Sequence, residues 1–154
     1  MLEYKVIQYI KMVFLFFIFI PLIKTDIERK IIPNIYPFSI AVIGFLLLVL
    51  TEEKKFFKSL FSSITALLLT AVLVTVIRYF MKKGFGMGDV KLLLSLSWIQ
   101  GIEIFLKTME ITVLLSFVFI IIMLSIKKIE REDSIPFAPF VAIGTVMAQF
   151  IDCI

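Results

Sequence analysis

The sequence contains no histidine and only one cysteine, Cys153, close to its end. Without histidine there is no imidazole for general base catalysis, for a Ser–His triad, for an HExxH zinc site or for ligation of haem iron. One cysteine can form neither an internal disulfide nor a cysteine zinc cluster. If the chain is an enzyme, its acid–base chemistry therefore depends on carboxylates, lysines or tyrosines.

Charged residues are scarce, and they lie between long apolar blocks. Of the 154 residues 18% are charged and 61% are apolar, and the mean hydropathy is +1.09. Because soluble domains carry about a quarter charged residues, this composition predicts an integral membrane protein with an all-α fold. The net charge of +4 does not indicate nucleic-acid binding, since Lys and Arg flank the apolar blocks and form no continuous basic face.

Six apolar stretches approach the roughly 20 residues that a transmembrane helix needs. The sequence predicts a single integral-membrane domain over residues 1–154, a bundle of about six transmembrane helices at about 6–23, 35–50, 59–77, 92–106, 108–126 and 136–151. Lys5 and Lys11 before "MVFLFFIFIPLI" also resemble the start of a signal peptide, but no small-residue cleavage site follows. We therefore expect the first stretch to stay in the protein as a span.

The short loops give the orientation, because cytoplasmic loops carry an excess of Lys and Arg. If the loops alternate between the two sides, one side collects ten of these residues: Lys24, Arg29, Lys30, Arg78, Lys82, Lys83, Lys91, Lys127, Lys128 and Arg131. The other side collects five, or six with Lys11: Lys5, Lys54, Lys55, Lys58 and Lys107. The side with ten is predicted to be cytoplasmic, which places both termini outside.

Two acidic residues, Asp26 and Asp89, differ from the others because each lies within a few residues of a predicted span end. Both fall on the predicted cytoplasmic side, and ionisable groups near the membrane are costly and often functional. Two carboxylates brought close together in a low-dielectric site tend to share one proton. The charged member can take a proton from water while the protonated member polarises a peptide carbonyl, so the pair suits peptide hydrolysis with no metal or cofactor.

Structural alternatives exist for each of these features. Asp89 could be the N-cap of the apolar run "VKLLLSLSW", and Asp26 could be an ordinary charge flanking a span. Gly86 and Gly88 permit a close approach by another segment, and they belong to a "GFGMG" stretch that resembles a phosphate loop. That stretch lacks the GK[ST] ending, and no strand precedes it.

The remaining candidates concern helix entry. Pro33 and Asn34 in "KIIPN" predict a helix start, and Pro136 and Pro139 predict the first turn of the last span. Lys91, two residues after Asp89, is interpreted as a positive-inside anchor, with the alternative that it keeps a carboxylate charged.

Three motifs in order resemble the type IV prepilin peptidases: "DIERKIIPN" from Asp26, "GMGDVKLL" from Gly86, and "PFAPFVAIG" from Pro136. The GxGD aspartate is shared with the preflagellin peptidases and presenilins, and the resemblance covers residues 23–144 or so. It implies a membrane aspartyl endopeptidase that cleaves the short basic leader from pilin-like precursors at the cytoplasmic membrane face. Asp26 and Asp89 match the catalytic pair of that family.

Two further expectations follow from the resemblance. The longest family members carry an N-terminal domain with paired CxxC motifs and an N-methyltransferase activity, so we expect this chain to be a minimal form without that activity. Because the predicted cytoplasmic loops are positive, a basic leader is not attracted by them as a whole. Docking is expected to depend on the precursor's apolar helix packing against the spans, with Asp26, Asp89 and Glu28 meeting leader lysines.

The alternative function is a small membrane transporter or a non-catalytic subunit of a pilus or secretion assembly. A transporter usually places its ionisable residues near the middle of the membrane, whereas here only Lys11 and Glu103 lie there. A scaffold subunit would tolerate replacement of both aspartates by asparagine, and a protease would not.

Overall fold

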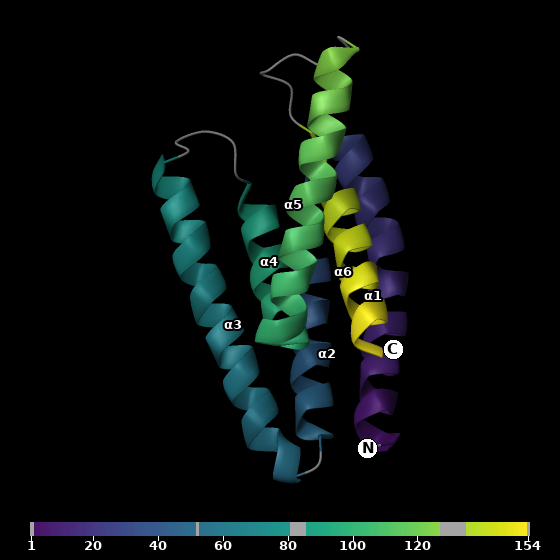
Figure 1. Ribbon diagram of the computed structural model, residues 1–154, viewed down its shortest axis with the longest axis vertical. Helices are drawn as coiled ribbons and strands as arrows, with labels where there is room; N and C mark the ends of the chain where they lie inside the picture. The colour runs from purple at the N-terminus through teal and green to yellow at the C-terminus, as the bar shows by residue number, and fades with distance from the viewer. Residues whose placement is uncertain (1, 52, 81–85, 127–134, 154) are drawn as a thin grey trace.

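Six helices pack side by side in one bundle (Figure 1). The computed structural model describes residues 2–51, 53–80, 86–126 and 135–153. The helices are α1 (Leu2–Arg29), α2 (Ile35–Val49), α3 (Glu53–Phe80), α4 (Met87–Gln100), α5 (Ile102–Ser125) and α6 (Ala138–Cys153). No strand occurs within these ranges, so the all-α membrane bundle expected from the sequence is confirmed.

Helix length divides the bundle into two groups. Three helices are long and apolar enough to cross a membrane, over Lys5–Arg29, Lys55–Tyr79 and Ile102–Ser125. The helices α2, α4 and α6 have 15, 14 and 16 residues. At about 1.5 Å per residue they are about 21–24 Å long, which is less than the roughly 30 Å of a hydrocarbon core. The short helices therefore leave space at the ends of the bundle.

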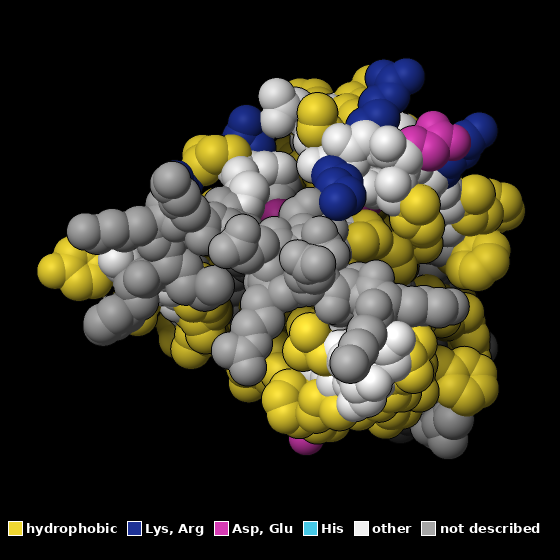
Figure 2. Space-filling model, turned by 90° about the horizontal axis from the view of Figure 1, so that it is seen from above, with side chains coloured by type: hydrophobic (Ala, Val, Ile, Leu, Met, Phe, Trp, Pro, Cys, Tyr) yellow, Lys and Arg dark blue, Asp and Glu magenta, His cyan; other side chains and the backbone are white. Residues whose placement is uncertain are grey.

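The outside of the bundle is apolar. Phe17, Val72 and Phe117 on the three long helices are 65%, 65% and 61% exposed. Figure 2, which looks down on the upper end of Figure 1, shows hydrophobic side chains around the flanks and basic side chains on part of the rim. Apolar surface costs roughly 25 cal/mol per Å² in water and nothing comparable in lipid, so these flanks suit a bilayer.

The interior combines an apolar core with buried polar side chains, several of which bond within their own helix. The main core cluster joins α1, α2, α4 and α6 through fully buried residues that include Leu15, Leu22, Ile40, Leu92 and Val141. Buried hydroxyls bond back to their own helix. On α3 the Thr70 hydroxyl donates to the Ala66 carbonyl at 2.7 Å, and on α5 the Thr112 hydroxyl donates to the Thr108 carbonyl at 2.6 Å. Such bonds need no water, which suits a helix in a membrane.

The junction between α4 and α5 lies earlier in the chain than the sequence predicts. The predicted boundary was at Lys107, but α4 ends at Gln100 and α5 begins at Ile102. Gly101 between them has φ +76°, a left-handed conformation that glycine adopts readily. The Ile102 N–H donates to the Ser62 hydroxyl of α3 at 3.0 Å. The helix α4 also begins at Met87, five residues before the predicted span.

Asp26 and Asp89 lie near the same end of the bundle, as the parity of the predicted spans requires. In Figure 1 the end of α1 and the start of α4 lie toward the upper end of the bundle, the N-terminus lies near the lower end, and the C-terminus lies in the lower half. Five of the ten basic residues assigned to the upper end are outside the described residues: Lys82, Lys83, Lys127, Lys128 and Arg131. That this end faces the cytoplasm stays a prediction.

Candidate active site

The side chains of Asp26 and Asp89 line one cavity of about 330 Å³ at the upper end of the bundle. Its walls come from the last turns of α1, the segment that follows, the first turn of α4 and the entry to α6. The other lining residues include Ile32, Gly88 and Phe137. Two carboxylates far apart in sequence therefore line the same cavity.

Asp26 is buried in α1 and receives a backbone hydrogen bond from α6. Its residue is only 4% exposed, and the Ala138 N–H donates to Asp26 Oδ2 at 2.8 Å. Ala138 is the first residue of α6, so the positive end of that helix also faces the carboxylate. A hydrogen bond to a charged group contributes about 1.5–3 kcal/mol, so α6 stabilises a negative charge on Asp26.

The end of α1 turns the chain back toward α4. Lys30 has φ +53°, and its N–H donates to the Asp26 carbonyl at 2.9 Å, so a left-handed residue ends the helix. After this turn Ile32 is 6% exposed and belongs to the core. The reversal therefore buries Ile32 in the wall of the cavity that Asp26 also lines.

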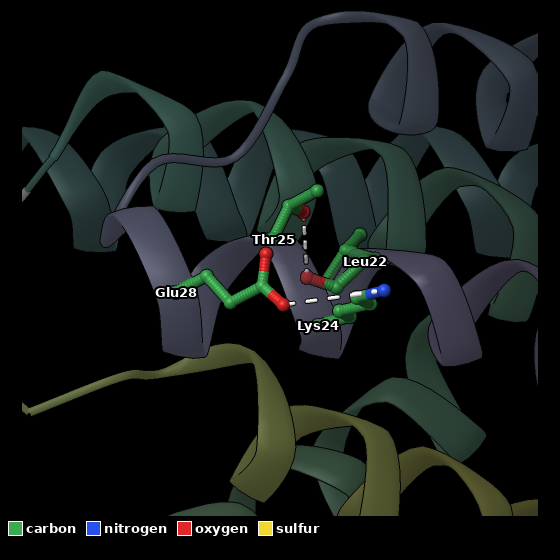
Figure 3. Close-up of polar contacts among 4 residues, drawn as sticks. All are labelled: Leu22, Lys24, Thr25 and Glu28. Carbon is green, nitrogen blue, oxygen red and sulfur yellow. Dashed lines mark hydrogen bonds and ion pairs between the residues drawn. The ribbon is translucent and has the colours of Figure 1, made fainter.

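The turn of α1 around Asp26 also carries Glu28, which the sequence suggested as a partner for leader lysines. Figure 3 shows the Glu28 carboxylate paired with Lys24, and the Thr25 hydroxyl bonded to the Leu22 carbonyl. The ion pair is 4.0 Å long, and the Glu28 side chain is 55% exposed. Glu28 does not line the cavity, so its contact with a leader stays a prediction.

Gly88 allows the two halves of the site to meet. A Cβ placed on Gly88 would lie 2.9 Å from the Ile32 Cβ and 3.2 Å from the Ile32 carbonyl oxygen. Real Cβ atoms do not approach this closely, so only glycine permits the contact. It holds the first turn of α4 against the segment after Asp26, and Asp89 is the next residue.

Asp89 is the third residue of α4, and the N-cap is Gly86 with φ −65° and ψ 145°. The interpretation of Asp89 as an N-cap is therefore wrong, because the helix begins before it. The pKa of Asp89 is raised to about 6, mainly by burial and also by the nearby negative charge of Asp26, while a hydrogen bond from the Gly86 backbone acts in the opposite direction. Of the two carboxylates, Asp89 is thus the one suited to hold a proton.

The supporting residues lie around this site in different ways. The Lys91 ammonium donates to Asn34 Oδ1 at 2.9 Å, which ties α4 to the start of α2. Lys91 does not line the cavity, and no bond from it to a carboxylate is found in the part of the chain that the structure describes.

The three predicted helix-entry prolines also differ in position. Pro139 lies in the first turn of α6, as predicted. Pro136 comes two residues before α6, so the expected first-turn position is wrong for it. Pro33 precedes the N-cap Asn34, and its carbonyl accepts the Tyr36 N–H at 3.2 Å. It thus supports the entry to α2 from outside the helix.

The cavity has the groups for acid–base chemistry. Among the described residues, its lining holds two acidic residues, Asp26 and Asp89, and one basic residue, Lys30. A volume of about 330 Å³ is large compared with the roughly 30 Å³ that one water occupies in the liquid. Among the described residues no group of three or more His, Cys, Asp or Glu is arranged to hold a metal ion. One carboxylate can accept a proton from water while the other donates one.

Sequence reasoning identified both aspartates and both glycines but missed two partners in the site. These are Ile32, which contacts Gly88, and the Ala138 N–H, which binds Asp26. A backbone donor has no signature in residue type. The only available signal was the proline-marked helix entry next to Ala138.

Comparison with known proteins gives one match. The family described as the type IV leader peptidase family matches residues 12–126, which include α2 to α5, most of α1 and both aspartates. Neither the curated proteins nor the solved structures searched gave a match. The match covers most of the chain and includes two of the three sequence motifs, those from Asp26 and from Gly86, while the third, from Pro136, lies beyond it. The chain belongs to the type IV leader peptidase family.

Proposed function

We propose that this protein is an aspartyl endopeptidase that removes the short basic leader from pilin-like precursors at the cytoplasmic membrane face. Membership of the family supports a membrane protease. The observation that carries the aspartyl mechanism is the single cavity lined by Asp26 and Asp89, in which one carboxylate has a hydrogen-bond donor and the other has a raised pKa.

In the proposed mechanism Asp26 acts as general base and Asp89 as general acid. Asp26, held by the Ala138 N–H, takes a proton from the water that attacks the scissile carbonyl. Protonated Asp89 donates a hydrogen bond to the carbonyl oxygen and transfers its proton as the tetrahedral intermediate forms. When the intermediate collapses, the amine leaves with the proton from Asp26 and Asp89 recovers its own. Water and one peptide bond are consumed, and the pair is restored.

An apolar groove next to the site supports the proposed substrate. The groove has a volume of about 700 Å³ between α2, α3 and α4, and its lining includes Phe38, Ala41 and Leu94. Asn34 and Lys91, which are bonded to each other, also line it. Since Lys91 is two residues beyond Asp89, this part of the groove is close to the cavity. We propose that the precursor's apolar helix lies in the groove and its basic leader extends across the cavity.

The decisive test uses purified protein in lipid vesicles and a precursor with a basic leader and an apolar helix. Wild type should release the leader, and Asp26→Asn and Asp89→Asn should each lower the rate by roughly a hundredfold or more, because each removes a proton-transfer group. Glu110→Gln changes an exposed acid of α5 in the same isosteric way and should act like wild type. Thermal unfolding of each variant checks that it is folded.

Release that survives either aspartate substitution would remove that residue from the mechanism. If the wild type itself releases nothing, the non-catalytic alternative is favoured. A second substrate, the leader and cleavage site without the apolar segment, tests the groove. It should be cleaved much more slowly, and equal rates for the two substrates would contradict docking of the apolar helix.

A further inference from the structure

A second cavity, of about 410 Å³, lies at the opposite end of the bundle from the aspartates. It arises because the junction of α4 and α5 does not reach that end. The junction is bonded to Ser62, well inside α3, which begins at Glu53. Figure 1 shows α2 and α3 extending below the junction. The helices α1, α2 and α3 therefore wall a recess whose floor is the junction.

The lining of this recess is rich in positive charge. Lys11 of α1 and Lys55 and Lys58 of α3 line it, together with three serines of α3, and Glu103 is the one acidic residue in the lining among those that the structure describes. Glu103 is exposed. Outside the lining, Asp152 interacts electrostatically with Lys11 and lies 3.9 Å from Lys107. Among the described residues that line the recess, lysines therefore outnumber acidic residues.

A buried amide on the floor of the recess needs an acceptor. Gln100 lines the recess and is 5% exposed. Its Oε1 accepts the Thr108 hydroxyl at 3.1 Å, whereas its Nε2 is buried and has no hydrogen-bond partner among the described residues. Leaving a buried donor unpaired costs free energy. A ligand with acceptor oxygens would remove that cost.

The helix ends at the floor of the recess do not decide the sign of the charge on a bound ligand. The positive N-terminal end of α5 faces the recess, but the negative C-terminal end of α4 lies next to it. The two effects oppose each other. The case for an anion rests on the lysines and on the unpaired amide of Gln100.

We infer that this recess binds a phosphate-bearing anion, namely the headgroup of an anionic phospholipid at the end of the bundle opposite the aspartates. Lys11 and Lys58 would meet the phosphate charge, and the Gln100 amide would donate to one of its oxygens. A lipid fits better than a soluble anion because exposed Phe57 and Phe61 neighbour the lining residues of α3 and suit contact with acyl chains. Anionic lipids attract lysines near the membrane surface in this way.

Trp98 provides a direct readout, since it lines the recess and is the only tryptophan in the chain. The full chain is placed in phosphatidylcholine vesicles, and a rising fraction of lipid is replaced by phosphatidylglycerol with brominated acyl chains, which quench indole fluorescence. Brominated phosphatidylcholine gives the background from lipid contacting the flanks. We expect phosphatidylglycerol to reach half-maximal quenching at a clearly lower fraction than phosphatidylcholine.

The matched variants tie this preference to the recess. Lys58→Gln should raise the phosphatidylglycerol fraction needed for half-maximal quenching by roughly fivefold, and Lys11→Gln with Lys58→Gln by more. Lys5→Gln changes another exposed lysine of α1 that does not line the recess, and the preference should remain. Gln100→Glu keeps an acceptor for Thr108 but adds negative charge, and it should abolish the preference even if the double variant fails to fold.

Inorganic phosphate, added to vesicles of phosphatidylcholine alone, distinguishes the two sources of the anion. If phosphate changes Trp98 fluorescence in wild type but not in Gln100→Glu, and phosphatidylglycerol shows no preference, the anion site stands and its assignment to lipid is overturned. Equal quenching by both lipids with no response to phosphate overturns the whole inference. Peptidase activity is not part of the readout, so the result is independent of the proposed function.

Discussion

At the scale of single residues, the two aspartates differ in how the protein treats their charge. Asp26 is almost fully buried and accepts a backbone N–H from the start of α6. Asp89 is half-buried, and its pKa is raised by burial and by the charge of Asp26. This asymmetry favours one proton on the pair, located on Asp89.

The raised pKa predicts the pH dependence of cleavage. If protonated Asp89 is required, the active fraction falls as the pH rises through the pKa of about 6. We expect kcat/KM to fall by about tenfold for each pH unit well above that value. A profile of kcat/KM against pH measures this, and a separate titration of the substrate shows whether its own ionisation contributes. A profile that is flat across neutral pH would contradict the assignment of the proton to Asp89.

The titration of Asp89 also makes the free energy of unfolding depend on pH. The direction of this dependence is opposite to that produced by most acidic residues. The folded-state pKa of Asp89 lies above its ordinary value of 3.8. Its contribution is therefore most favourable below about pH 4 and is lost as the pH rises through about 6. Asp89→Asn cannot titrate, so the thermal unfolding temperature of that variant should depend less on pH across this window than that of wild type.

Gly88 and Gly86 form a natural pair for substitution because a side chain would meet different obstacles at each. At Gly88 a Cβ collides with Ile32, including its backbone carbonyl, whereas at Gly86 it lies 3.0 Å from the Asp89 carboxylate, which can shift. Gly88→Ala should cost about 1–3 kcal/mol of unfolding free energy and lower cleavage strongly. Thermal unfolding and leader release measure the two effects. Equal stability of Gly88→Ala and Gly86→Ala would contradict the close approach.

At the scale of helices, α6 supplies the hydrogen-bond donor to Asp26, although this helix lies beyond the residues matched by the family. Its start supplies the Ala138 N–H, and its middle packs closely on α5 at Gly144. A Cβ on Gly144 would lie 2.9 Å from the Thr108 carbonyl and would collide with the Thr112 hydroxyl. The distance between α5 and α6 therefore depends on this glycine.

Gly144→Ala should push α6 away from α5. We expect a loss of about 1–3 kcal/mol in stability from the overpacking, together with lower cleavage because Ala138 moves with α6. Ile143→Ala, at a neighbouring position that is 48% exposed, is the control and should change both quantities little. If Gly144→Ala is as stable and active as the control, the packing of α6 on α5 does not position Asp26.

At the scale of the whole molecule, the alternation of the helices brings both aspartates into one cavity near one end, and both chain termini lie in the other half of the bundle (Figure 1). The positive-inside rule assigns the aspartate end to the cytoplasm. Cysteine labelling tests this in a Cys153→Ser background. Ile31→Cys, 63% exposed in the lining of the aspartate cavity, should resist a membrane-impermeant reagent added outside, and Lys58→Cys, exposed in the lining of the recess, should react. The reverse pattern would overturn the predicted sidedness.

Part of the site could be predicted because its signals are local. Asp26, Asp89 and the glycines before Asp89 stand out by residue type and by their position next to apolar blocks. The junction at Gly101 could not be predicted in this way, because the apolar run continues through it. Its position depends on a bond to Ser62 of another helix, whereas hydropathy alone predicted the boundary at the next lysine, Lys107.

The sequence by itself determined the class of molecule, the number of apolar segments, the identity of the two carboxylates and their shared end. These follow from composition and from the parity of membrane crossings, which need no knowledge of packing. Only the tertiary structure decided which carboxylate receives the Ala138 N–H, why Gly88 must be glycine, and that a basic recess lies at the far end. Each of these depends on helices that are distant in the chain, and contacts of that kind leave no local pattern in the residues that make them.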